Sequence, residues 1–362
     1  MGFDLLFKEL DLTKIKLKNR LIMAPMTTTS GEADGSFSKQ EIRYLSQRAA
    51  GGIGMIISPA SYVHESGHAF ERQVGCHRDE MIPSLRECAE TINRYGAASI
   101  LQIHHGGNAT RESLSGNQPL APSGLRNRRG TSEMPRALTE DEITLLISSF
   151  AKAAGRAKLA GFTGIEIHGA NTYLLQQFFS PYTNKRIDQW GGSFVNWSRF
   201  ACEVVREIQE EVGEDYPVIY RISPEEEDPL GYSTFDTIRL LDSLLACGID
   251  IVHVSSWDFH DSLRKDIPEG TNPTVLIKEA FPDVPVIGVG GIKTPEDALG
   301  VINQGVDLVA MGKVLMLEKD WANKVKSGNA DEIRTKIVSE EERQSLDIPD
   351  QMKEYSKHFF KV

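Results

Sequence analysis

Eight short apolar segments constrain the fold of this chain more than any other feature. They comprise residues 21–26, 53–58, 98–103, 164–167, 218–222, 251–255, 286–289 and 308–311. Within them the apolar residues run continuously, which is typical of parallel strands buried on both faces. Eight strand–helix units that close on themselves make a (β/α)8 TIM barrel, and we predict this fold class. A doubly wound open sheet is the alternative, although it does not usually reach eight parallel units.

Amphipathic stretches between the apolar segments complete the alternating pattern. Helical periodicity covers residues 39–50, 79–95, 139–160, 196–212, 235–246, 274–281 and 295–303. Thr139 and Thr294 precede acidic first turns, as N-cap residues do. Five glycines lie just beyond predicted helix ends, where a left-handed cap favours glycine: Gly96, Gly161, Gly213, Gly248 and Gly305.

Composition and charge exclude several classes of protein. The 362 residues carry a net charge of −11, which argues against nucleic acid or an anionic membrane surface as a partner. No apolar run approaches the ~20 residues of a membrane span, and the first residues show no signal peptide. The four cysteines are widely spaced without a C-x-x-C pair, so we expect reduced thiols, no metal site and a cytoplasmic location.

The chain is predicted to form a single domain over residues 1–362 with one long excursion. Residues 104–138 are rich in Gly, Ser, Pro, Asn and Arg and lack sustained periodicity. A loop of this length in a compact fold is usually a lid or a binding element, and this one follows the third strand. We therefore expect an active-site lid, with a disordered surface insertion as the alternative.

Residues 164–181 carry the first candidate site. A strand stops there and presents His168, Asn171 and Tyr173 within six positions, all able to donate hydrogen bonds to one oxygen-bearing substrate. Barrel enzymes build their sites from side chains at the carboxyl ends of strands. Taken alone, these residues leave open that His168 and Asn171 satisfy the loop backbone while Tyr173 packs on the next helix.

Glycines after the last two strands predict a phosphate site. Gly290 and Gly291 follow the seventh strand, and Gly312 and Lys313 follow the eighth. Backbone N–H groups at such positions can approach an anion closely, and the lysine adds a positive charge.

Three polar residues at other strand ends suit the ring of a flavin mononucleotide, FMN. Thr27 and Gln102 can bond the polar edge of the isoalloxazine, and Arg221 can neutralise charge that develops near N1 on reduction. The structural alternatives are a salt bridge for Arg221 and a satisfied core amide for Gln102.

From residue 17 to about residue 317 the sequence resembles the Old Yellow Enzyme family of flavin-dependent ene-reductases. The resemblance is carried, in order, by LKNRLIMAPMT, LQIHHGG, PLAPSG, ALTEDEI, AGFTGIEIHGANTYLLQQFFSP, TNKRIDQWGGS, RIS, VIGVGGIKTPEDA and DLVAMGK. It implies a barrel with non-covalent FMN that NADH or NADPH reduces. The reduced enzyme would then reduce small molecules, namely activated alkenes such as enones, quinones or nitro compounds. A homo-oligomer stays open.

The resemblance also implies roles for individual residues. His168 and Asn171 match the donor pair that holds the substrate's electron-withdrawing oxygen, and Tyr173 matches the proton donor. His104 occupies a position that would line the substrate pocket. Flavin contacts are matched by Ala24, Pro25, Met26, Thr27, Ala60, Gln102 and Arg221, and phosphate contacts by Gly290, Gly291, Gly312 and Lys313. Thr27 takes the position that tunes the flavin's potential.

Five residues depart from the family pattern. Lys313 stands where arginine is usual and Thr172 where glycine is frequent, and both leave the chemistry credible. Trp190 and Trp197 replace a tyrosine and an arginine, and Asn108 replaces another arginine. These three leave substrate identity and oligomer contacts open.

Two other functions remain as alternatives. A 2,4-dienoyl-CoA reductase-like barrel would add an iron–sulfur cluster and a second dinucleotide domain, but the sequence has no clustered cysteines and ends about 50 residues after the eighth strand. A flavin-free phosphate-binding barrel would have no need of Thr27, Gln102 and Arg221 at three separate strand ends.

Overall fold

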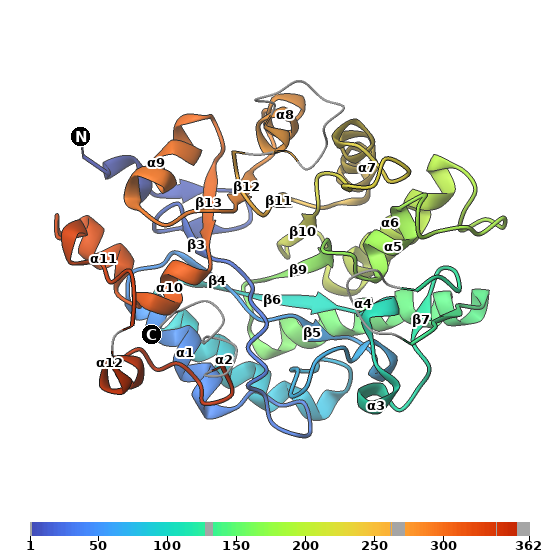
Figure 1. Ribbon diagram of the computed structural model, residues 1–362, viewed down its shortest axis with the longest axis horizontal. Coiled ribbons are helices and arrows are strands. Elements are labelled where there is room, and N and C mark those ends of the chain that lie inside the picture. The colour runs from blue at the N-terminus through green and yellow to red at the C-terminus, as the bar shows by residue number, and fades with distance from the viewer. Residues whose placement is uncertain (1, 127–132, 261, 263–271, 338, 353–362) are drawn as a thin grey trace.

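A closed ring of eight parallel strands forms the centre of the molecule (Figure 1). The computed structural model describes residues 2–126, 133–260, 262, 272–337 and 339–352. In ring order the strands are β3 (Leu21–Met23), β4 (Met55–Ile57), β6 (Ala98–His104), β9 (Gly164–Gly169), β10 (Val218–Ile222), β11 (Ile251–Ser255), β12 (Val286–Val289) and β13 (Leu308–Met311). β13 pairs with β3, and β4 pairs with β6, which closes the ring. The predicted (β/α)8 barrel is confirmed.

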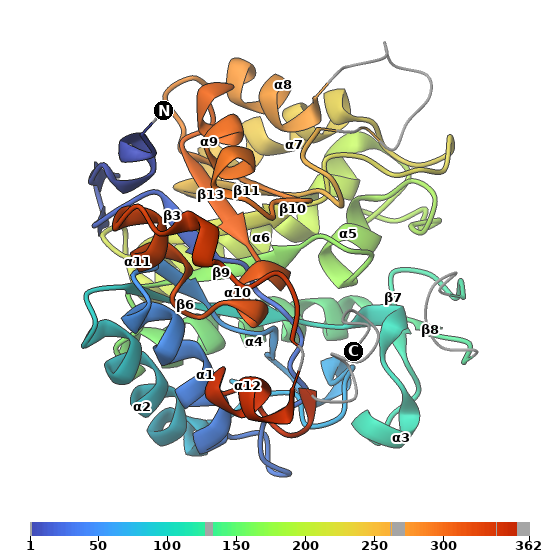
Figure 2. The ribbon, with the colours of Figure 1, turned by 60° about the vertical axis from the view of Figure 1, so that its left-hand side comes forward.

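Helices cover the outside of the barrel between consecutive strands (Figures 1 and 2). They are α1 (Lys39–Ala50), α2 (Ile82–Asn93), α4 (Glu140–Ala160), α6 (Phe194–Val212), α7 (Thr234–Cys247), α8 (Pro273–Ala280) and α9 (Pro295–Asn303). Their ends follow from the capping residues: Thr139 and Thr294 accept hydrogen bonds from the N–H groups three residues later. All five predicted cap glycines have positive φ, from 67° to 111°. Every predicted helix is therefore present.

The barrel interior changes from apolar to polar along the strands. Alternate side chains of a strand face the same side, so residues two apart on a barrel strand lie in successive interior layers. The first layer is apolar and includes Ile100, Ile219, Ile251, Ile287 and Leu308. In the next layer four strands present buried polar side chains: Gln102, Glu166, Arg221 and His253. This polar layer lies toward the carboxyl ends of the strands, where barrel enzymes have their sites.

Smaller elements lie outside the strand–helix repeat. A hairpin of β1 (Leu10–Asp11) and β2 (Lys16–Leu17) packs Ile15 and Leu17 into the interior apolar cluster. The remaining short elements are η1 (Asp4–Phe7), β5 (Ser61–Tyr62), η2 (Glu65–Gly67), η3 (Asp79–Met81), α5 (Leu174–Phe179), α10 (Lys313–Leu317), α11 (Trp321–Lys326), η5 (Ala330–Glu332) and α12 (Glu340–Ser345). Within the described ranges, none of the helices combines the length and the apolar character that crossing a membrane requires.

The predicted excursion, residues 104–138, begins as the third barrel strand ends. It contains η4 (Gly107–Ala109), α3 (Glu112–Ser115) and the parallel pair β7 (Leu120–Ala121) and β8 (Arg136–Ala137). Figure 1 shows α3 and β7 beyond the arrowhead of β6. Residues 127–132 of the excursion lie outside the described residues. Its action as a lid stays a prediction.

Candidate active site

The predicted site residues come together at one end of the barrel. Each lies at the carboxyl end of a barrel strand or in the loop that follows. In chain order these positions are 24–27 after β3, 60 after β4, 102 in β6, 168 in β9, 171 and 173 after β9, 221 in β10, 290 and 291 after β12, and 312 and 313 after β13. The closed parallel topology is what gathers residues so far apart in sequence.

The loop after β9 holds Asn171 in a defined orientation. Asn171 Oδ1 accepts a hydrogen bond from Ser255 Oγ at 3.1 Å, and its backbone N–H donates to Ser223 Oγ at 2.9 Å. Because the amide oxygen faces Ser255, the Nδ2 group is the one left to donate elsewhere. Both serines lie just at or beyond a barrel strand end, and sequence analysis gave them no role.

His168 is buried and electrically neutral at physiological pH. Its Nδ1 accepts a hydrogen bond from the Ala170 N–H at 3.3 Å, so the ring proton lies on Nε2. Burial, followed by the positive charges and imidazoles of His104, Arg221 and His253, holds the pKa of His168 well below its usual range. His168 therefore offers a neutral Nε2–H donor.

Tyr173 lies against two imidazoles at the start of α5. Its ring makes edge contacts with His168 (centroids 4.9 Å apart) and with His104 (4.4 Å). Phe70 lies 6.1 Å from the same tyrosine ring. The half-buried phenol thus sits in an aromatic cluster with the predicted donor histidine.

Thr172 explains why glycine is frequent at its position. It has φ +67°, a left-handed conformation that costs a β-branched residue more than a glycine. Two glutamines of α5 hold it there: Gln176 Oε1 accepts from the Thr172 N–H at 2.8 Å, and Gln177 Nε2 donates to the Thr172 carbonyl at 2.6 Å. The departure is accommodated locally.

Arg221 carries a buried guanidinium that contacts no counter-ion among the described residues. It is 8% exposed, and within the described part of the chain no carboxylate forms an ion pair with it. Its Nε lacks any hydrogen-bond partner there. Burial lowers the pKa of Arg221, while Glu166 and Tyr173 raise it. The salt-bridge alternative for Arg221 is therefore wrong, and the group is placed to receive an electron-rich ligand atom.

Gln102 is satisfied on one side only. Its Nε2 donates to Glu166 Oε1 at 2.7 Å, while no described group donates to its Oε1. The core-amide alternative therefore accounts for the Nε2 group of Gln102, and its Oε1 atom is available to a ligand.

The glycines after β12 and β13 lie where a Cβ atom would crowd neighbouring protein atoms, so the backbone itself faces its surroundings at these positions. A Cβ on Gly290 would lie 2.8 Å from the Phe259 nitrogen, and one on Gly312 would lie 3.0 Å from Met26 Sδ. Gly290 and Gly291 have φ of +126° and +70°. This backbone cradle, with Lys313 at the first position of α10, fits the terminal phosphate of FMN.

The segment after β3 is held by a hydrogen bond to helix α1. Thr27 is half-buried, and its neighbour Thr28 donates a hydrogen bond to Glu41, a fully buried residue of α1. After β4, the Ala60 carbonyl accepts a hydrogen bond from Gln73 Nε2 at 2.9 Å. Burial raises the pKa of Glu41 to about 7.

His104 lies in the aromatic cluster with a specified tautomer. Gln73 Nε2, whose own oxygen accepts from two backbone N–H groups, lies 3.1 Å from His104 Nδ1. The proton of His104 is therefore on Nε2, which has no partner among the described residues. Burial lowers the pKa of His104 to about 3. Its place beside His168 fits the expectation that it lines the pocket; the roles of Gln73 and Phe70 carried no sequence signal.

The three other residues that depart from the family pattern, Asn108, Trp190 and Trp197, each make contacts within the fold. Asn108 and Gln177 form two hydrogen bonds. Gln177 Nε2 donates to Asn108 Oδ1 at 2.7 Å, and the Asn108 backbone N–H donates to Gln177 Oε1 at 3.1 Å. Trp190 packs against Phe200 with ring centroids 6.5 Å apart. Trp197 packs against the core from α6. Asn108 thus helps to fix the glutamine that supports the site loop.

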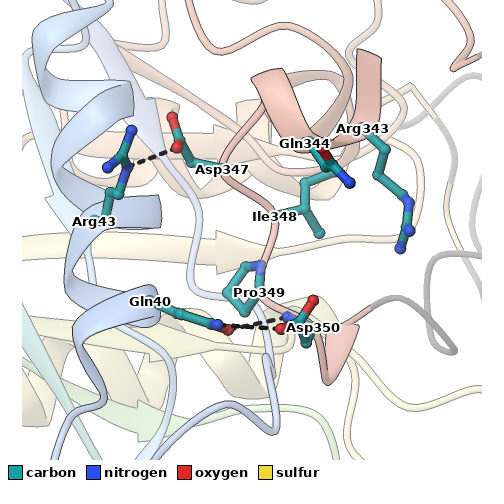
Figure 3. A pocket seen from close by; sticks show the side chains of 8 residues that line it. All are labelled: Gln40, Arg43, Arg343, Gln344, Asp347, Ile348, Pro349 and Asp350. Carbon is teal, nitrogen blue, oxygen red and sulfur yellow. Dashed lines mark hydrogen bonds and ion pairs between the residues drawn. The ribbon is translucent and has the colours of Figure 1, made fainter. Parts of the chain in front are cut away.

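A hollow elsewhere on the surface is separate from this site. It lies between α1 and the segment around α12, as Figure 3 shows. Arg43 Nε lies 2.6 Å from Asp347 Oδ1, and Gln40 Nε2 donates to Asp350 at 3.1 Å. None of the predicted site residues lines it, so these contacts attach the late segment of the chain to the barrel wall.

Comparison with known proteins agrees with the fold. Residues 5–332 match the model of the NADH:flavin oxidoreductase / NADH oxidase family. A probable NADH-dependent flavin oxidoreductase of Bacillus subtilis, YqiG, is 36% identical over 342 residues, which are 93% of this chain and 91% of that protein. An NADH:fumarate oxidoreductase of Klebsiella pneumoniae is 39% identical over 94% of this chain. The chain spans only 37% of that relative's length.

Solved structures show the same architecture. Morphinone reductase in complex with tetrahydroNAD superposes with a TM-score of 0.81 at 27% identity, over 97% of each chain. An old yellow enzyme homologue from Zymomonas mobilis gives a TM-score of 0.81 at 25% identity, over 96% of this chain and 99% of that one. The family match and the shared barrel thus place the chain among the NADH:flavin oxidoreductases. The chain belongs to the Old Yellow Enzyme family of NADH:flavin oxidoreductases.

Membership gives the cofactor and the reductant. FMN is the flavin and a nicotinamide is its reductant, as the sequence predicted. The residues present fit FMN, since Nε of the buried Arg221 has no hydrogen-bond partner among the described residues, and glycines with exposed backbone N–H groups follow β12 and β13.

Proposed function

We propose that this protein takes hydride from NADH or NADPH and reduces activated alkenes, quinones or nitro compounds. The observation that carries the proposal is the pair of oriented neutral donors, His168 Nε2–H and Asn171 Nδ2–H, beside the phenol of Tyr173. Thr27, Gln102 and Arg221 would hold the flavin ring, together with backbone at 24–26 and 60. Gly290, Gly291, Gly312 and Lys313 would hold its phosphate. FMN supplies the hydride when it is bound and reduced.

The two donors would act on the oxygen that activates the alkene. Negative charge grows on that oxygen when hydride reaches the β-carbon of an enone. Donors fixed where this charge develops lower the barrier more than they strengthen ground-state binding. Ser255 and the Ala170 N–H supply the fixing, because they orient the Asn171 amide and the His168 ring.

Tyr173 would complete the reduction by protonating the α-carbon from its phenol O–H. The edge contacts with His168 and His104 hold the ring near the donor pair. Arg221 does not compete with Tyr173 as the proton donor, because a guanidinium keeps its proton across the physiological pH range.

Two relatives support an alkene as substrate. The Klebsiella protein is named for fumarate, and a relative from Vibrio harveyi, 39% identical over 92% of this chain and 34% of its own length, is an NADH:acrylate oxidoreductase. Both named substrates are alkenes activated by a carboxyl group. Because this chain matches only part of each relative, we extend the reaction class rather than the substrate.

The roles of the site loop predict different lesions. Tyr173→Phe should lower enone reduction about 100-fold or more, the usual contribution of a general acid, and should leave flavin reduction and quinone turnover nearly intact. Quinones can take their proton from water after hydride transfer. His168→Ala should instead weaken binding of phenols, which mimic the enolate. Enone reduction at the parent rate in Tyr173→Phe, or an equal loss of quinone activity, would remove Tyr173 from the mechanism.

We also propose a cytoplasmic location and a small-molecule substrate as the sole partner class, with self-association left to measurement. The four cysteines support a reducing compartment, since none forms a disulfide in the structure. The excursion begins where β6 ends, at the strand end that carries the candidate site, which supports its proposed action as a lid.

A further inference from the structure

Three buried side chains form a continuous hydrogen-bonded chain in the polar layer of the barrel interior. Gln102 Nε2 donates to Glu166 Oε1 at 2.7 Å, and His253 Nδ1 lies 2.6 Å from Glu166 Oε2. Glu166 and His253 are completely buried and Gln102 is 1% exposed. The three residues come from β6, β9 and β11, so the chain crosses the interior of the barrel.

The carboxylate fixes the orientation of both neighbours. Neutral His253 carries its single proton on Nδ1, where Glu166 accepts it, and burial lowers the pKa of this imidazole despite the attraction of Glu166. A flipped Gln102 amide would point its oxygen at the carboxylate, which accepts and cannot donate. Glu166 therefore determines which side of the Gln102 amide faces the mouth of the barrel.

Glu166 is also the negative charge next to Arg221. Arg221 lies on β10, the strand between those of Glu166 and His253, and its Cα partners are His168 and His253. The guanidinium makes no ion pair among the described residues. Burial lowers the pKa of Arg221, and the carboxylate of Glu166 makes the larger of the two contributions that oppose this shift. A buried carboxylate and a buried guanidinium thus share one layer of the interior without touching.

We propose that Glu166 and His253 are positioning residues for the flavin. Glu166 fixes the Gln102 amide and offsets part of the positive field of Arg221, so the bound flavin is harder to reduce than Arg221 alone would make it. His253 donates its Nδ1 proton to Glu166 and so keeps this carboxylate in place. This inference rests on the proposed placement of FMN against Gln102 and Arg221, and neither positioning residue has to touch the cofactor.

Glu166→Gln tests the electrostatic part. The variant keeps the shape but removes the charge, and leaves Arg221 unopposed when negative charge develops on the flavin. The affinity for reduced FMN, relative to that for oxidised FMN, should rise on the order of tenfold. This is the effect of one unit charge on another about 10 Å away at an effective dielectric constant of about 20. For a two-electron couple that is a midpoint potential about 30 mV more positive.

The matched control is Glu318→Gln, which removes another buried carboxylate, one that pairs with Lys324 at 2.7 Å outside the barrel interior. Its midpoint potential should equal the parent's. Thermal unfolding of all variants separates the proposal from a purely structural role. A structural role would lower the melting temperature of Glu166→Gln and leave its potential unchanged.

Two variants of His253 carry the test if Glu166→Gln does not fold. His253→Asn keeps an N–H donor near the position of Nδ1, and should keep the parent potential. His253→Leu removes the donor that holds the Glu166 carboxylate in place, so Glu166 offsets less of the positive field of Arg221 and the potential should shift in the positive direction. Equal potentials in Glu166→Gln and parent, or equal shifts in the two His253 variants, would overturn the inference. Failure of the parent to bind FMN would instead overturn the proposed function.

Discussion

Replacement of Glu41 by glutamine should change how stability depends on pH. Glu41 is fully buried on α1, receives one hydrogen bond from Thr28, and has its second carboxylate oxygen without a partner among the described residues. Burial raises its pKa from 4.5 to about 7. An ionised carboxylate is costly in such a place, because no second donor replaces the lost water.

The sign and the size follow from proton linkage. The folded state binds the proton more tightly than the unfolded chain, so the stabilisation is fully present below about pH 4.5 and is lost as pH rises through about 7. A pKa difference of one corresponds to about 1.4 kcal/mol, so the full difference is about 3 kcal/mol. Glu41→Gln should abolish this loss, because glutamine does not titrate.

Denaturant unfolding at pH 5 and pH 8, with saturating FMN in both buffers, measures the effect. The parent should lose about 3 kcal/mol more than Glu41→Gln between these pH values. Glu90→Gln, which changes an exposed glutamate of α2, should follow the parent. If the parent and Glu41→Gln lose stability in parallel, Glu41 is not the titrating group and its burial does not cost what we infer.

Three further substitutions test separate parts of the site. Lys313→Ala should weaken FMN binding by about 1–3 kcal/mol and leave riboflavin binding unchanged, because riboflavin lacks the phosphate; equal losses in titrations of both ligands would mean that Lys313 acts through folding. Thr27→Ala should make the bound flavin harder to reduce, and an unchanged midpoint potential would remove Thr27 from the ring contacts. Thr172→Gly should raise the free energy of unfolding by about 0.5–1 kcal/mol, since glycine accepts a positive φ; a lower unfolding midpoint in urea would contradict the strain at this position.

The fold could be predicted from sequence because each element carries a local signal. The strands β10, β11, β12 and β13 have the predicted bounds, since continuous apolar runs end abruptly at polar residues or glycine. The helices α4 and α9 begin after Thr139 and Thr294, and α4, α6 and α7 end at the cap residues Gly161, Gly213 and Gly248. The small elements, such as the β1–β2 hairpin and α5, are too short to show a period, and tertiary contacts fix them.

The candidate site could be located from sequence but not its supporting contacts. Gln102, His168 and Arg221 could be predicted as site residues because they lie near the carboxyl ends of strands. A barrel brings these positions together whatever sequence lies between them. The partners of these residues come from other strands: Glu166 orients Gln102, and Ser255 orients Asn171. Such pairings depend on the register between strands distant in sequence, which no local pattern encodes. The individual roles of the site residues stay predictions.

The central claim is that one FMN binds at the carboxyl end of this barrel, with its ring against Arg221 and Gln102. The most direct measurement is a calorimetric titration of flavin-free protein with FMN, made on the parent and on Arg221→Met. We expect one FMN per chain for the parent and an affinity at least about tenfold lower for the variant, the cost of losing a charged hydrogen bond. A parent that takes up no FMN, or a variant that binds it as tightly as the parent, would contradict the account.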